Sequence, residues 1–137
     1  MKLINVLFAV TLLCLSTAAR ADEATAGPNG GQRKHSGKYH LELVVKDVAL
    51  TVYVTGDKDS KVATKGATGT ATVLAGKGTA NVKLEPSGEN ALAGSGSFQP
   101  APAMKVVVSL TLPGQPPLQA RFTPLESTKP AAKAAAK

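Results

Sequence analysis

The stretch YHLELVVKDVALTVYVT, residues 39–55, decides the fold class of this chain. Its apolar and aromatic residues alternate with others, so that one face collects Tyr39, Leu41, Leu43 and Val45, followed by Leu50, Val52 and Val54. Such alternation is typical of β-strands, because successive side chains of a strand point to opposite faces of a sheet. The stretch therefore predicts strands at residues 39–46 and 49–55, joined as a hairpin through Asp47 and Val48.

Shorter segments of the same kind follow, separated by turn residues at intervals of roughly 8–12 positions. Strands are predicted at residues 70–75, 79–84, 90–94, 105–112 and 117–123, with a further short strand inside 61–64. Glycine, proline and serine fill the turns, and no helical pattern interrupts the series. About seven short antiparallel strands favour an all-β fold, an immunoglobulin-like β-sandwich, with a small barrel as the alternative.

Apolar residues on the inward faces of these strands form the predicted core. They are Leu41, Leu43, Val45, Leu50, Val52, Val54, Val73, Val82, Leu84, Phe98, Val106, Val108, Leu110 and Phe122. Composition also divides the chain into four parts. Residues 1–21 are predicted to be a signal peptide, 22–34 a flexible lead-in, 35–124 the β-sandwich domain, and 125–137 a disordered tail of alanine, lysine and proline.

The first residues have the three parts of a secretory signal. Lys2 supplies the positive charge, Val6 to Leu15 is an apolar run broken only by Thr11, and Ala19-Arg20-Ala21 is a cleavage site of the A-x-A kind. The run is shorter than the roughly 20 apolar residues that span a bilayer. We therefore expect an exported, periplasmic protein.

Cleavage after Ala21 removes Cys14, the only cysteine. The remaining chain has no thiol for a disulfide, a metal or nucleophilic catalysis. Loss of Lys2 and Arg20 leaves 14 basic and 9 acidic residues, a net charge of about +5. The positive residues are spread out and aromatic residues are few, so the composition argues against a nucleic-acid partner.

Motifs of catalysis are missing from the sequence. It holds no G-x-S-x-G, no H-E-x-x-H and no phosphate-binding loop, so we expect no enzyme activity. Asp57-Lys58-Asp59-Ser60 resembles the start of a calcium loop, but an EF-hand needs glycine at its sixth position and glutamate at its twelfth. Val62 and Thr68 stand there, which favours an ordinary solvated loop.

Transition-metal binding is the sharpest chemical hypothesis. His40 and Glu42 project from the same face of a predicted strand, and His35 lies just before that strand. Imidazole and carboxylate together suit copper or zinc, and three protein ligands leave a position for water or a transfer partner. The alternative is that both histidines are ordinary surface residues near the start of a strand.

An ordered series of short motifs resembles a known group of proteins. The motifs are Gly30-Gly31, Tyr39 to Asp47, Leu50 to Val54, Thr64 to Ala67, Thr72 to Leu74 and Val108 to Gly114. In this order they resemble small exported bacterial proteins and the β-domain of periplasmic adaptor subunits of heavy-metal, copper-type RND efflux systems. The resemblance implies a periplasmic β-domain linked to copper or other heavy metals.

This chain departs from the group at two places. Relatives carry His-Gly-Gly at the first motif, whereas Asn29 precedes Gly30-Gly31 here, which removes one implied ligand. Relatives carry Asp-Gly in the first hairpin, whereas Asp47-Val48 stands here and disfavours a two-residue turn of the primed type. The matching Tyr-His-x-Glu motif keeps His40 and Glu42.

Two functions remain open from the sequence. The first is a small soluble periplasmic protein of heavy-metal binding or homeostasis, with a copper or zinc ion held by His35, His40 and Glu42. The second is a non-catalytic envelope interaction module without metal chemistry, which docks on an envelope or efflux protein by strand addition.

We expect the exported protein to begin at Asp22 and to lack lipid. Leu13 before Cys14 is not the small residue that lipid attachment requires, and Cys14 lies inside the apolar run. Intact-mass measurement and amino-terminal sequencing of protein from the periplasmic fraction check this. A mature chain that still begins at or before Cys14 would contradict it.

Overall fold

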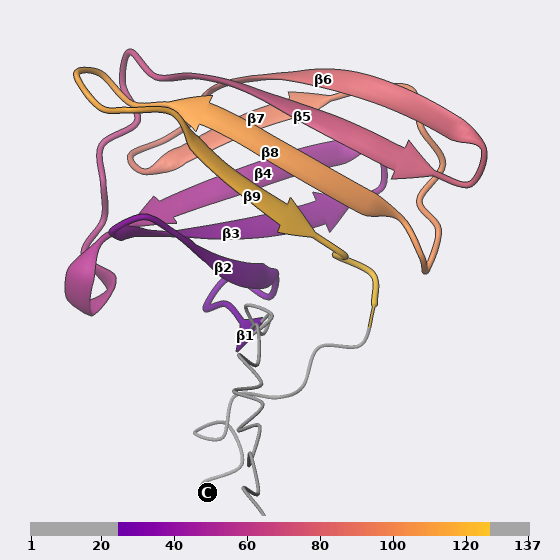
Figure 1. Cartoon of the computed structure of the whole chain (residues 1–137), viewed down its shortest axis with the longest axis horizontal. Coiled ribbons are helices and arrows are strands. Elements are labelled where there is room, and N and C mark those ends of the chain that lie inside the picture. The colour runs from indigo at the N-terminus through magenta and orange to yellow at the C-terminus, as the bar shows by residue number, and fades with distance from the viewer. Residues whose placement is uncertain (1–24, 127–137) are drawn as a thin grey trace, which may run out of the picture.

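The computed structural model describes residues 25–126 (Figure 1). This part of the chain holds nine β-strands and one 3-10 turn, and none of it is α-helical. The elements are β1 (Thr25–Ala26), β2 (Gln32–Ser36), β3 (Tyr39–Lys46), β4 (Ala49–Thr55), η1 (Asp57–Asp59), β5 (Thr68–Ala75), β6 (Gly78–Pro86), β7 (Ala91–Ser95), β8 (Lys105–Thr111) and β9 (Leu118–Phe122).

All nine strands belong to one antiparallel sheet in the order β1-β2-β3-β4-β7-β6-β5-β8-β9. The sheet curls like a half-barrel, so that β9 comes to lie beside β2 (Figure 1). The predicted all-β antiparallel fold is confirmed. The seven-strand, immunoglobulin-like sandwich is wrong, because β6 and β7 stay paired at Glu85–Ala93 and Pro86–Leu92 and so keep the two layers continuous.

Two strands lie where the sequence predicts a flexible lead-in at residues 22–34. They are β1 and most of β2. The sequence of β2, QRKHS, contains no apolar residue, so the alternation that reveals the other strands is missing. It is a strand because it pairs in register along β3, from Gln32 opposite Leu43 to Ser36 opposite Tyr39.

Two local predictions differ from the structure. Asp47 and Val48 do form a two-residue connection, with Lys46 paired to Ala49. Asp47 takes a φ of 53°, a left-handed conformation that aspartate tolerates better than most residues with a Cβ atom. The short strand expected inside residues 61–64 is reduced to a single bridge between Thr55 and Lys61.

The core fills the inside of the curl. Every predicted core residue is buried except Val45 and Phe98, which are partly buried and pack against it. Leu92, Met104 and Leu118 join the core as well. Met104, with no exposed surface, is thus a packing residue in the part of the chain that the structure describes. Each fully buried side chain of this size contributes about 1.5–3 kcal/mol relative to exposure.

Side chains rather than a backbone ladder join β2 to β9. The Gln32 amide donates to the Thr123 carbonyl (3.1 Å) and accepts from the Thr123 N–H (2.7 Å). The Ser36 hydroxyl donates to the Gln119 carbonyl (2.9 Å) and accepts from the Gln119 N–H (3.1 Å). Each side chain therefore satisfies one backbone donor and one backbone acceptor, Ser36 in β9 and Gln32 at Thr123 directly after β9, as a paired strand would. We call these four bonds the seam.

Parts of the predicted organisation lie outside the described residues. These are the signal peptide of residues 1–21 and nearly all of the tail of 125–137. Within residues 25–126, no helix has the length and apolar character needed to cross a bilayer.

We expect Gln32→Ala to lower the free energy of unfolding by about 1–3 kcal/mol, because it leaves the N–H and C=O of Thr123 without their seam partners. Urea denaturation followed by circular dichroism measures this. Gln119→Ala is the matched control, since Gln119 enters the seam only through its backbone and its side chain is exposed. Equal losses in the two variants would mean that the seam contributes nothing.

Candidate functional site

The two histidines face each other on the outer side of the β2–β3 hairpin. The hairpin turns at Gly37, whose φ of 61° suits glycine, and Lys38. His35 and His40 are direct cross-strand partners, and their ring centroids lie 4.1 Å apart with the ring planes tilted by 57°. His35 is exposed and His40 is half-buried. The hairpin register thus brings together two of the three predicted ligands.

The surroundings of His40 disfavour its charged form. Burial is the main cause that lowers the pKa of His40 below its ordinary value, and the charges of Arg33 and His35 lower it further. A hydrogen bond to the backbone of Gly56 and the charge of Asp59 act in the opposite direction. A lowered pKa keeps the imidazole neutral at pH 7, and neutral imidazole is the ligand form. The buried Nδ1 of His40 has no hydrogen-bond partner.

Glu42, the third predicted ligand, has a different set of partners. Its side chain is buried, with a relative exposure of 4%. One carboxylate oxygen accepts from the N–H groups of Asn29 (2.8 Å) and Gly31 (2.9 Å), and the other accepts from the side-chain amide of Asn29 (2.9 Å). Both oxygens are therefore committed to the loop of residues 27–31, and the structure does not join Glu42 to the histidine pair.

The glycines of this loop leave room for the carboxylate. A Cβ atom on Gly27 would lie 2.1 Å from the Cδ of Glu42, and one on Gly31 would lie 2.3 Å from the carbonyl oxygen of Leu43. Backbone N–H groups that converge on an anion in this way form a nest. The motif Gly-Pro-Asn-Gly-Gly therefore surrounds Glu42, a role that the sequence shows only as turn-forming residues.

An ion pair that the sequence did not reveal lies beside the histidines. Arg33, two residues before His35 on the same face of β2, bonds through Nη2 to an Oδ1 of Asp59 in η1. The two residues are 26 positions apart in the chain, so no local pattern links them. No group of three or more His, Cys, Asp or Glu side chains within residues 25–126 is arranged to hold a metal ion.

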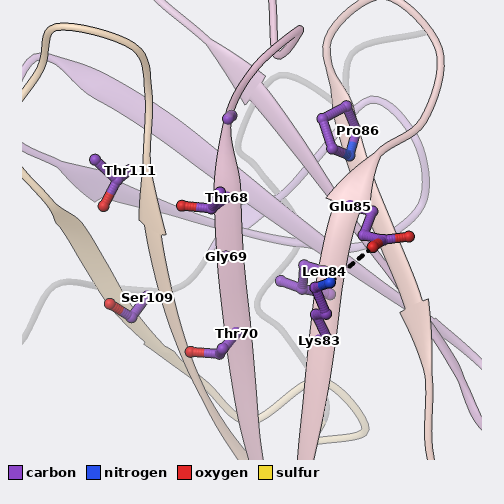
Figure 2. A pocket seen from close by; sticks show the side chains of 10 residues that line it. Thr68, Gly69, Thr70, Lys83, Leu84, Glu85, Pro86, Ser109 and Thr111 are labelled. Atoms are coloured by element: carbon purple, nitrogen blue, oxygen red, sulfur yellow. Dashed lines mark ion pairs between the residues drawn. The ribbon is translucent and has the colours of Figure 1, made fainter.

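A large hollow lies elsewhere, on the outer face of β5, β6 and β8. It measures about 720 Å³ and is lined by Ala67, Thr68, Gly69, Thr70, Lys83, Leu84, Glu85, Pro86, Ser109 and Thr111. Figure 2 shows its four hydroxyl-bearing side chains on β5 and β8 and the Lys83–Glu85 ion pair (3.0 Å) at its side. No lining residue is a histidine or an aromatic, so this hollow offers neither a soft metal ligand nor a stacking surface.

Comparison with known proteins adds no assignment. Neither a family model, nor a curated protein, nor a solved structure matches this chain. The site must therefore be judged by its own geometry.

We expect Glu42→Gln to lower the free energy of unfolding by about 1.5–3 kcal/mol, because an amide nitrogen cannot accept the bond that the second oxygen receives from Asn29. Urea denaturation at neutral pH measures the loss. Glu126→Gln, at an exposed position, should leave stability unchanged. If Glu42→Gln were as stable as the parent, the carboxylate nest would have no structural role.

Proposed function

We propose that this chain is an exported β-domain that binds a divalent transition metal, copper or zinc, through His35 and His40. The observation that carries the proposal is the cross-strand pair itself, with the two ring centroids 4.1 Å apart. Its role is heavy-metal binding or homeostasis in the periplasm, without catalysis.

The two imidazoles supply part of the ligand set that a copper or zinc ion needs. Imidazole nitrogen is a preferred ligand of Cu(II) and Zn(II). Two imidazoles on one rigid hairpin supply two adjacent coordination positions and leave the others to water or to a transfer partner. An open site of this kind fits a carrier or a buffer better than a permanent structural metal, which is normally closed by four protein ligands. Glu42 does not fit as a ligand, because the loop of residues 27–31 takes up both its oxygens.

Two features of the sequence support the same function. The signal-peptide pattern of residues 1–21 supports a periplasmic location, and the ordered motifs resemble the β-domain of heavy-metal efflux adaptors. This chain differs from that group at Asn29. Here Asn29 has a structural role, because it closes the loop over Glu42 through two hydrogen bonds.

Titration of Cu(II), and separately Zn(II), into the mature protein tests the proposal. We expect one site whose dissociation constant rises about tenfold or more in His40→Ala and in His35→Ala, because each removes a ligand. The double variant measures the residual affinity of the chain terminus and other surface groups. Circular dichroism confirms that the variants fold.

Binding that survives in the double variant would overturn the metal proposal. A parent protein that binds neither ion would favour the alternative of an interaction module without metal chemistry.

A further inference from the structure

We propose that Asn29 is a deamidation site, that Glu42 slows the reaction, and that the product can no longer close the loop of residues 27–31. Asn29 is followed by Gly30, whose lack of a side chain leaves the backbone nitrogen of the Asn29–Gly30 bond unhindered as a nucleophile. Such a modification lies beyond the proposed function and does not depend on metal binding.

The reaction converts the side-chain amide of Asn29 into a carboxylate. The backbone nitrogen of Gly30 attacks the Cγ of Asn29, a new C–N bond closes a succinimide ring, and the Cγ–Nδ2 bond breaks. The amide nitrogen leaves as ammonia and takes the proton of the Gly30 N–H with it. Water then opens the ring at either carbonyl, which gives aspartate or isoaspartate. The solvent supplies this water, and no other co-reactant is needed.

The tip of the loop is open to the solvent. Asn29 and Gly30 are both exposed, and a Cβ atom built on Gly30 would have no heavy atom within 4 Å apart from its chain neighbours. The Gly30 N–H donates to the carbonyl of Gly27 over 3.2 Å, at the long end of the usual range. The tip therefore has room for the ring and for the water that opens it.

Glu42 holds the closed loop in a form that does not react. Its carboxylate accepts from the side-chain amide of Asn29 (2.9 Å) and from the backbone N–H of the same residue (2.8 Å). Ring closure brings the Cγ of Asn29 onto the nitrogen of Gly30, and so it breaks the bond of the amide to Glu42. The reaction thus proceeds from the open loop, and its rate follows the fraction of molecules in which Glu42 has released Asn29.

The product cannot restore this contact. An ionised carboxylate at position 29 has no hydrogen to donate to Glu42, and its charge repels that of Glu42. The closed loop has no spare space around Glu42, since a Cβ atom on Gly27 would lie 2.1 Å from its Cδ. Each deamidation therefore leaves open the loop that leads into Gln32 of the seam.

Two further asparagines of the described residues serve as internal controls. Asn81 lies in β6 before Val82, and Asn90 precedes Ala91 at the start of β7. The following residue carries a side chain in both cases and hinders ring closure. The amide of Asn90 also donates to the carbonyl of Val54 (3.1 Å). We therefore expect both to react more slowly than Asn29.

Timed incubation of the full mature protein at mildly alkaline pH, followed by tryptic digestion and mass spectrometry, tests the proposal. Residues 22–33, 78–83 and 84–105 form separate tryptic peptides, so one digest follows all three asparagines. We expect aspartate and isoaspartate to accumulate first at Asn29. Glu42→Gln should accelerate this reaction about tenfold, because it weakens hydrogen bonds to a charged group. Gln32→Ala is the matched control, since it weakens β2 but keeps the contacts of Glu42, and it should leave the rate unchanged.

A second pair of variants tests the product. Asn29→Asp should lower the urea midpoint, whereas Asn81→Asp adds the same charge at an exposed position and should not. Deamidation of Asn29 no faster than that of Asn81 and Asn90 would overturn the site. An unchanged rate in Glu42→Gln, or an equal acceleration in Gln32→Ala, would overturn the control by Glu42. If Asn29→Asp is as stable as the parent, the claim that the product keeps the loop open is wrong.

Discussion

A curled sheet must satisfy the backbone groups at its two ends, and this constraint shapes the whole molecule. At the β9 end, the hydroxyl of Ser36 bonds to the N–H and C=O of Gln119, and the amide of Gln32 bonds to those of Thr123 directly after β9. An unpaired strand edge otherwise exposes a row of donors and acceptors to further pairing. The seam also keeps Phe122 and Leu118 of β9 against the core. The curl of the sheet and the burial of the core therefore depend on each other.

The strand that makes the seam also carries the candidate site. Gln32 and Ser36 face inward from β2, whereas Arg33 and His35 face outward. The alternation of a strand thus gives these four polar residues two separate tasks. Glu42 strengthens the arrangement from β3, because its carboxylate fixes the loop that leads into β2. The hairpin that carries both histidines is therefore held by hydrogen bonds on two sides, by the seam and by the bonds of Glu42 to the loop of residues 27–31.

The proposed site is small and open, and its chemistry follows from that. Two imidazoles bind a soft or borderline ion without enclosing it, which suits capture and release. The lowered pKa of His40 reduces the competition between protons and a metal ion for its ring nitrogens.

The sequence by itself determined the all-β class, the bounds of β3 and β4, and nearly all of the core, because an apolar residue at every second position can be buried only on one face of a strand. It also placed His35 and His40 close together along the chain. It did not reveal β2, whose residues are all polar, nor the partners of Gln32, Glu42 and Arg33, which lie 11 to 91 positions away. Only the tertiary structure decided that Glu42 serves the fold and that Asp59 pairs with Arg33, because hydrogen bonds between distant residues leave no periodic pattern in the chain.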